Sequence, residues 1–149
     1  MSTVNVKRLW LNKPIIMSFF SWILLGLLLA IDQFTKWWYQ MRDLVIFNGG
    51  GVFGIFPSWG WALFLIIVWG IIVRYWILKP WDMQHWGMGF IIVGGLGNIV
   101  DRLLFGGSVR DFIYYPVVGF YGNVADIFLA IGVIIVMFCQ TVESKEQRS

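Results

Sequence analysis

Four long apolar runs restrict the fold of this sequence more than any other feature. They cover approximately residues 15–38, 59–78, 86–105 and 123–140. An α-helix needs about 20 predominantly apolar residues to cross the hydrocarbon core of a bilayer, and each run has roughly that length. The sequence therefore predicts an all-α membrane protein with four transmembrane helices, in which residues 1–149 form a single integral membrane domain.

The composition agrees with a membrane location and excludes several other classes. Hydrophobic residues make up 59% of the chain and charged residues 13%, whereas about a quarter of a soluble domain is charged. The scattered basic residues form no stripe, so no nucleic-acid partner is expected. The single cysteine, Cys139, rules out an intramolecular disulfide. The single histidine, His85, rules out a cluster of histidine ligands, and no metal or cofactor is expected. We predict that His85 is a surface residue in the loop before the third run.

The distribution of lysine and arginine predicts the orientation in the membrane. Seven of the eleven would lie on the side of the N-terminus, namely Lys7, Arg8, Lys13, Arg74, Lys79, Lys145 and Arg148. The positive-inside rule then places both termini in the cytoplasm. The first apolar run follows basic residues, as in a signal peptide. It continues to Trp38 without a small-residue cleavage site, so we expect a retained span.

The segment between the first two runs has strand and turn character. Leu44–Phe47 and Val52–Phe56 have strand-like composition, and Asn48-Gly49-Gly50-Gly51 between them is a strong turn signal. We predict a small extracytoplasmic β-hairpin, or cradle, between the first and second spans. It is either an ordinary connection or a cover for a bound ligand.

Polar side chains inside the apolar runs are candidates for function, because charge at membrane depth is costly. Asp32 and Lys36 are four residues apart and share a helix face. They form either a simple intrahelical ion pair or part of a cavity. Gly94, Asn98 and Asp101 line one face of the third span, with Arg102 beside them.

Carboxylates are the reactive groups that this zone offers. Asp101, Asp111 and Asp126 all fall towards the predicted outer side, and two carboxylates brought together can share a proton and activate water. Pro116 and Gly119 allow the chain to return between Asp111 and Asp126, which favours that pair. Helix capping by Asn123 and Asp126 is a competing explanation. A Ser108–Lys36 pair lacks a nucleophile-elbow pattern.

Five motifs follow one another along the chain. They are Asp32-Gln33-x-Thr35-Lys36, Asn48-x-Gly50-x-x-Phe53, Gly94-Gly95-x-Gly97-Asn98-x-x-Asp101-Arg102, Gly107-x-Val109-x-Asp111-Phe112 and Asn123-x-Ala125-Asp126. In this order they resemble the motifs of the signal peptidase II family, the bacterial intramembrane aspartyl proteases that process lipoproteins. Each motif alone is weak, but all five in order are highly specific. The resemblance covers nearly the whole chain.

The resemblance implies an activity and a set of site residues. Asp111 and Asp126 would be the catalytic dyad. Substrate binding or support would come from Asp32, Lys36, Asn48, Gly94, Asn98, Asp101, Arg102, Val109, Asn123 and Ala125. The enzyme would cleave diacylglyceryl-modified prolipoproteins before the lipidated cysteine, at the outer face of the bacterial cytoplasmic (inner) membrane. Its partners would be these prolipoproteins and membrane lipids, and we expect a monomer.

Two departures from the family pattern and one rival function stay open. Arg110 stands where the family usually has Val, and Gly122 where it usually has Phe. Arg110 either contacts lipid headgroups only or belongs to the site. The rival is a channel or transporter subunit with Asp32, Asp101 and Asp126 along an ion path. Such a path needs acidic residues spread across the membrane.

Overall fold

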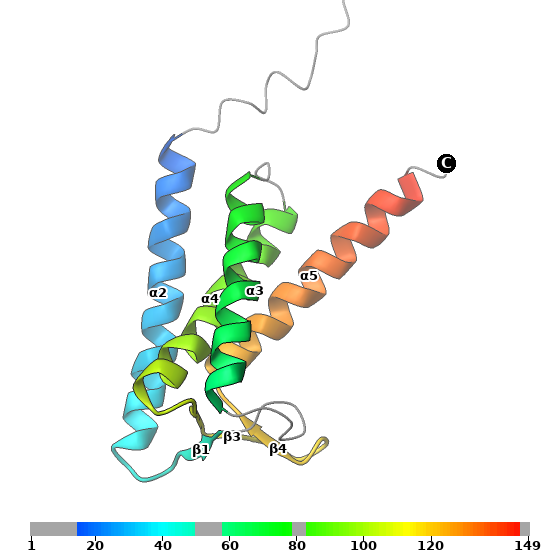
Figure 1. The fold of residues 1–149 in the computed structure, drawn as a ribbon. Helices are drawn as coiled ribbons and strands as arrows, with labels where there is room; N and C mark the ends of the chain where they lie inside the picture. The colour runs from blue at the N-terminus through cyan, green and yellow to red at the C-terminus, as the bar shows by residue number, and fades with distance from the viewer. Residues whose placement is uncertain (1–14, 50–57, 79–82, 147–149) are drawn as a thin grey trace, which may run out of the picture.

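The computed structural model describes residues 15–49, 58–78 and 83–146. Within them lie four helices, α2 (Ile15–Gln40), α3 (Ser58–Leu78), α4 (Met83–Leu104) and α5 (Val124–Glu146). Four three-residue strands accompany them, β1 (Ile46–Asn48), β2 (Val109–Asp111), β3 (Ile113–Tyr115) and β4 (Phe120–Gly122). The helices coincide closely with the four apolar runs. All of the strands gather at one end of the helices (Figure 1).

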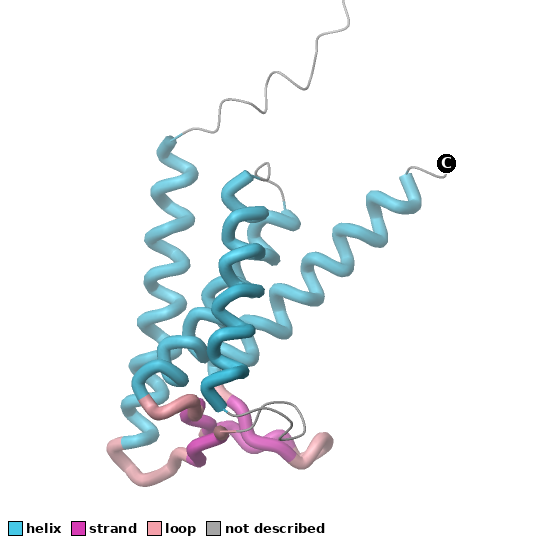
Figure 2. Tube along the Cα trace, in the orientation of Figure 1, coloured by secondary structure: helices cyan, strands magenta, loops and turns pink. Residues whose placement is uncertain are grey.

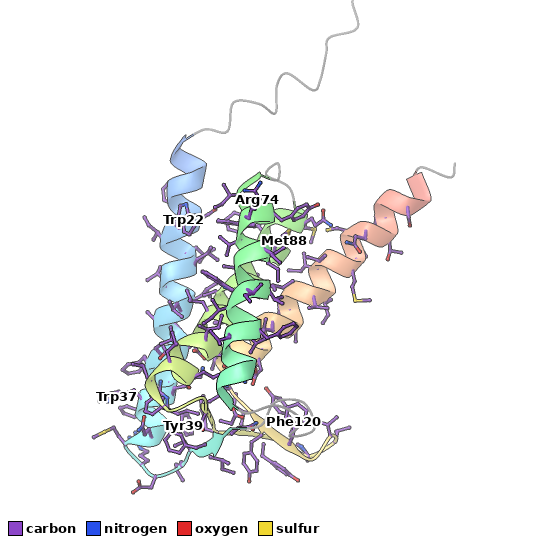
Figure 3. The ribbon with its side chains drawn as sticks, in the orientation of Figure 1. Trp22, Trp37, Tyr39, Arg74, Met88 and Phe120 are labelled. Carbon is purple, nitrogen blue, oxygen red and sulfur yellow. The ribbon has the colours of Figure 1, made fainter. Side chains whose placement is uncertain are left out.

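The exteriors of the helices are apolar. Among the described residues, α4 and the Val124–Val142 part of α5 are long and apolar enough to cross a membrane, and α3 contains a shorter apolar segment, Leu63–Ile77. Large apolar side chains point outwards from the helices (Figure 3). Ile67 of α3 is 63% exposed and Ile134 of α5 is 66% exposed. Outward apolar surfaces of this extent fit a membrane location.

Helix α4 is the central helix, because α2, α3 and α5 all pack against it. The buried apolar core combines residues of all four helices: Leu25, Trp76, Met88, Ile92, Val93 and Phe128. Glycines let α4 and α5 approach closely. A Cβ atom on Gly94 would lie 2.5 Å from the carbonyl oxygen of Ala125, and one on Gly132 would lie 2.5 Å from that of Gly87. The small residues seen in the sequence therefore have the role expected of them in membrane helix pairs.

The strands form two antiparallel pairs. In the first, β1 pairs with β2, with Ile46 opposite Asp111 and Asn48 opposite Val109. The second half of the predicted hairpin, Val52–Phe56, lies outside the described residues. The partner that the structure gives to β1 therefore comes from a distant part of the chain. Gly106 and Gly107, with φ of 62° and 89°, turn the chain from α4 back into β2.

The second pair, β3 with β4, is a hairpin that the sequence analysis did not predict as strands. Tyr114 lies opposite Tyr121, and Tyr115 lies opposite Phe120. The predicted return through Pro116 and Gly119 is confirmed, and Gly119 has a φ of 68°. Figure 2 shows both pairs of strands and their loops at the same end of the molecule.

The prediction for His85 is wrong. The residue lies in the first turn of α4 and is 2% exposed. Its ring stacks on Trp76 of α3 with the centroids 4.5 Å apart. The indole N–H of Trp76 donates to the His85 carbonyl at 3.0 Å. The physical reason is that α4 begins at Met83, so His85 packs against α3 instead of lying in a loop.

Candidate active site

The first carboxylate, Asp111, is the last residue of β2 and is 3% exposed. The β1–β2 pairing places Asn48 diagonally across the ladder from Asp111, on the same face. The Asn48 side-chain amide donates to Oδ2 of Asp111 at 3.0 Å. The next residue, Phe112, stacks on Tyr39 of α2 with the ring centroids 4.2 Å apart. Tyr39 lies at the strand end of α2 (Figure 3).

The second carboxylate, Asp126, lies in the first turn of α5, where Asn123 caps the helix. The backbone N–H of Asp126 donates to Oδ1 of Asn123 at 3.2 Å. The backbone N–H of Asn123 donates to Oδ2 of Asp126 at 3.0 Å. This reciprocal arrangement is a capping box. The capping explanation is therefore correct, and it also fixes the direction of the Asp126 carboxylate.

Asn123 also joins the two carboxylates. Its side-chain amide donates to Oδ1 of Asp111 at 2.7 Å and to Oδ1 of Asn98 at 3.1 Å. The Asn98 amide in turn donates to Oδ1 of Asp126 at 2.8 Å. Asp111 and Asp126 thus belong to one hydrogen-bond network in which Asn123 contacts both. The charge of Asp126 also acts on Asp111. Two carboxyl groups that interact in partly desolvated surroundings can share one proton.

The surroundings of Asp111 favour its protonated form. Burial raises the pKa of Asp111, and the nearby charge of Asp126 raises it further, while the amide donors of Asn48 and Asn123 oppose this shift. Burial also raises the pKa of the Tyr115 phenol, with added contributions from Asp126 and Asp111. The Tyr115 ring reaches this position because residue 122 is glycine. A Cβ on Gly122 would lie 2.9 Å from Cε2 of Tyr115 and 2.8 Å from Oδ2 of Asp126.

A buried charge cluster lies beneath the two carboxylates. Lys36 pairs with Asp32 at 2.9 Å and lies 3.6 Å from Asp101. It also donates to Oδ1 of Asn98 at 3.1 Å. Asp32 accepts the backbone N–H of Ala125 at 2.9 Å. The Asp32–Lys36 pair is therefore more than an intrahelical ion pair, because its contacts connect α2 to α4 and to the start of α5.

The remaining predicted residues surround this cluster. Val109 and Ala125 are buried, and Gly94 makes room for the Ala125 carbonyl. Arg102 donates to the carbonyl of Asn98 at 3.3 Å and interacts electrostatically with Asp126 and Asp111. The structure thus brings together the whole predicted set. Among the described residues, no group of three or more His, Cys, Asp or Glu side chains could hold a metal ion.

Three residues near the site were missed or left undecided by the sequence analysis. Gln33 donates to Asp101 at 3.3 Å, and its place inside the first motif was the signal for it. Tyr115 borders Asp126, but no sequence pattern marks it. Arg110 is 5% exposed and pairs with Asp101 at 2.8 Å. Its burial in the charge cluster argues against a residue that contacts lipid headgroups only, and a role for Arg110 in the site stays a prediction.

Comparisons with known proteins agree with the motifs. The family model described as "Signal peptidase (SPase) II" matches residues 24–142. The lipoprotein signal peptidase of Streptococcus agalactiae serotype V is 33% identical over an alignment of 132 residues, with coverage of 74% of this chain and 84% of the relative. That of Bartonella bacilliformis is 27% identical over 83% of this chain and 91% of the relative.

The fold is also found among solved structures. A bacterial membrane enzyme matches with a TM-score of 0.74 at 23% identity, over 86% of this chain and 91% of the other. A second bacterial membrane enzyme matches with a TM-score of 0.69 at 24% identity. These likenesses concern the fold alone. The family is shown by the sequence match over residues 24–142 and by the similar relatives, and the five motifs in order agree with it. The chain belongs to the signal peptidase II family of membrane proteases.

Proposed function

We propose that Asp111 and Asp126 are the catalytic dyad with which this chain removes signal peptides from lipid-modified prolipoproteins. Membership of the signal peptidase II family supports the activity, and an aspartic protease is the type known for it. The observation that supports the choice of dyad is the position of Asn123, which contacts both carboxylates. Asp101 instead contacts two cations, Lys36 and Arg110, so it serves as support.

The reaction needs one proton shared by the dyad. The ionised carboxylate takes a proton from water, while the protonated partner donates its proton to the scissile carbonyl oxygen. Water attacks the carbonyl carbon and gives a tetrahedral intermediate. When the C–N bond breaks, the carboxyl group that took the water proton gives it to the leaving nitrogen. A hydroxyl group of the intermediate returns its proton to the other carboxylate as the carbonyl forms again, so the dyad is singly protonated once more. Acid–base assistance of this kind contributes about 10²–10⁴-fold per group. The two titration steps belong to the pair.

The substrate would lie at the strand end of the molecule. All four helices would span the membrane, with both termini in the cytoplasm and the dyad at the extracytoplasmic side. Cleavage would occur before the diacylglyceryl-modified cysteine. Arg102 is the cation that we assign to the substrate backbone, since it is only partly buried and interacts with both dyad carboxylates. Asn48 would order Asp111 for the attack.

The dyad is tested by Asp111→Asn and Asp126→Asn, made separately in the full chain. Each should lower the cleavage of a lipid-modified precursor by at least about 10³-fold, because the remaining carboxyl group cannot supply both acid and base. Asp43→Asn is the matched control. Asp43 lies in an exposed turn with a φ of 56°, a conformation that asparagine adopts readily. Substantial cleavage by either dyad variant, with the control active, would refute the assignment.

The channel or transporter alternative is not favoured. An ion path needs acidic groups along the depth of the membrane, whereas Asp32, Asp101 and Asp126 belong to one cluster. In that cluster Lys36 contacts both Asp32 and Asp101. The family comparison also points to a protease.

A further inference from the structure

Arg110 directly precedes Asp111 in β2. Side chains alternate between the faces of a strand, so Arg110 points away from the face on which Asp111 meets Asn48. Its side chain is 5% exposed. A buried arginine needs several partners to offset its desolvation, and those partners indicate what the residue does.

The first partner of Arg110 is Asp101 of α4. The Arg110 backbone N–H donates to Oδ2 of Asp101 at 2.9 Å. The side chain adds Nε to Oδ2 at 3.2 Å and Nη2 to Oδ1 at 2.8 Å. The guanidinium therefore grips both carboxylate oxygens in the bidentate manner that only arginine provides. These contacts hold the strand that carries Asp111 against the end of α4.

The second set of partners lies on α2. Nη1 of Arg110 donates to Oε1 of Gln40 at 2.9 Å, and Nη2 donates to Oε1 of Gln33 at 3.0 Å. The guanidinium also lies 4.5 Å from the ring centroid of Phe105. Arg110 thus ties β2 to α4 and to two residues of α2 that lie about two turns apart. A valine at this position could make none of these polar contacts.

The charges around the dyad give Arg110 a further role. The described charged and titratable side chains here are Asp32 and Lys36 on α2, Asp101 and Arg102 on α4, Arg110 and Asp111 on β2, Tyr115 on β3 and Asp126 on α5. Four are acidic and three are basic, beside the neutral phenol. One shared proton on the dyad therefore makes the cluster electrically neutral. Lys36 lies closer to Asp32 than to Asp101, at 2.9 Å against 3.6 Å, so Arg110 is the main cation for Asp101.

We infer that Arg110 is a positioning residue of this enzyme. It fixes β2 against α2 and α4 so that Asp111 reaches Asn48 and Asn123, and it balances Asp101 so that the dyad holds a single proton in neutral surroundings. This inference rests on the proposed function, because it assigns Arg110 a role in the same reaction. Arg110 does not touch the substrate, so its loss should lower kcat and change KM little.

The neutral variant Arg110→Gln leaves an uncompensated negative charge on Asp101 near the dyad. A nearby negative charge disfavours ionisation of a carboxyl group. The whole bell-shaped pH profile of kcat should therefore move to higher pH. We expect kcat at the wild-type optimum to fall roughly 10- to 100-fold, the scale of losing hydrogen bonds to a charged group. A merely structural role would lower stability without moving the profile.

Two further variants separate charge from geometry. Arg110→Lys keeps the charge but cannot contact Asp101, Gln33 and Gln40 together. It should keep the wild-type pH profile while kcat falls about 10-fold. Asp101→Asn combined with Arg110→Gln removes both charges, and should return the profile to its wild-type position at a lowered rate. Arg42→Gln is the matched control, since Arg42 is an exposed arginine just past the end of α2 whose side chain contacts Trp38.

The experiment measures kcat, KM and pH profiles of the purified full-length variants on a lipid-modified precursor peptide. If the wild type cleaves the precursor but Arg110→Gln and Arg110→Lys match Arg42→Gln in kcat and profile, the inference is wrong. If Arg110→Gln does not fold, Arg110→Lys decides, and a displaced profile in that variant overturns the charge argument. A wild type without cleavage would contradict the proposed function instead.

Discussion

The Asp111 carboxylate shows how individual residues set the chemistry of this site. Its two oxygens accept the side-chain amides of Asn123 and Asn48, and these donors oppose the burial that raises its pKa. Asn48→Ala removes one donor to the ionised form, so the pKa of Asp111 should rise further. The acidic limb of the kcat/KM profile should then move to higher pH. Activity below the optimum should fall roughly 10- to 100-fold.

The pH profile of kcat/KM reports the free enzyme, so it tests this prediction for Asn48 directly. An unchanged acidic limb, with activity reduced equally at every pH, would show that Asn48 serves the substrate and not the titration of Asp111. The prediction separates the two roles that the sequence left open for Asn48.

Single residues differ in how far the sequence could predict their environment. The Asp32–Lys36 pair was predictable because a spacing of four places both side chains on one helix face. Arg110 and His85 were not, because their burial depends on other elements. Arg110 contacts Gln33, which is 77 residues away in the sequence. His85 is covered by Trp76 of the preceding helix. No local pattern carries such information.

The α4–α5 contact determines where the second half of the dyad lies. Gly132 of α5 faces the backbone of α4, since an added Cβ would lie 2.5 Å from the Gly87 carbonyl oxygen and 2.8 Å from the Ile91 backbone nitrogen. Gly132→Ala should therefore force the helices apart and destabilise the protein by about 1–3 kcal/mol. Gly70→Ala on α3 is the control, because nothing lies within 4 Å of its Cβ position. There alanine should be neutral or slightly stabilising.

Thermal unfolding in detergent compares the two glycine variants, with cleavage as a second readout. A Gly132→Ala protein as stable as Gly70→Ala would contradict the tight backbone contact. Movement of α5 should also displace Asp126, because Gly94, two turns from Gly87 on α4, faces the Ala125 carbonyl. Loss of activity in parallel with loss of stability is the expected result.

The elements also differ in how well the sequence predicts them. The helices were predictable because runs of about 20 apolar residues leave few alternatives in a membrane. The three-residue strands are too short to carry a periodic signal. The pairing of β1 with β2 joins residues 46–48 to residues 109–111, so it depends on how α2 and α4 lie side by side. No prediction from the sequence included that pairing; the family resemblance implied only that Asn48 would belong to the site.

On the scale of the whole molecule, the polar residues and the strands lie together at one end of an apolar helical assembly. Arg74, near the end of α3, lies towards the opposite end (Figure 3). Applied to the sequence, the positive-inside rule predicts that this opposite end is cytoplasmic, and the proposed dyad would then lie on the outer side. The gathering of Asp32, Asp101, Asp111 and Asp126 into one network was predictable from topology in outline, but their individual partners were not.

The proposed orientation predicts which end of the molecule meets each compartment. In a Cys139→Ser background, Val117→Cys places a thiol at the tip of the β3–β4 hairpin, where Val117 is 96% exposed. Ser144→Cys places one near the end of α5 on an exposed position. A membrane-impermeant maleimide should label Val117→Cys in intact cells, but Ser144→Cys only after permeabilisation. The reverse labelling pattern would place the dyad on the cytoplasmic side. That orientation would contradict the positive-inside rule, which assigns the basic N-terminal segment to the cytoplasm. Labelling of both thiols in intact cells would mean that α5 does not span the bilayer.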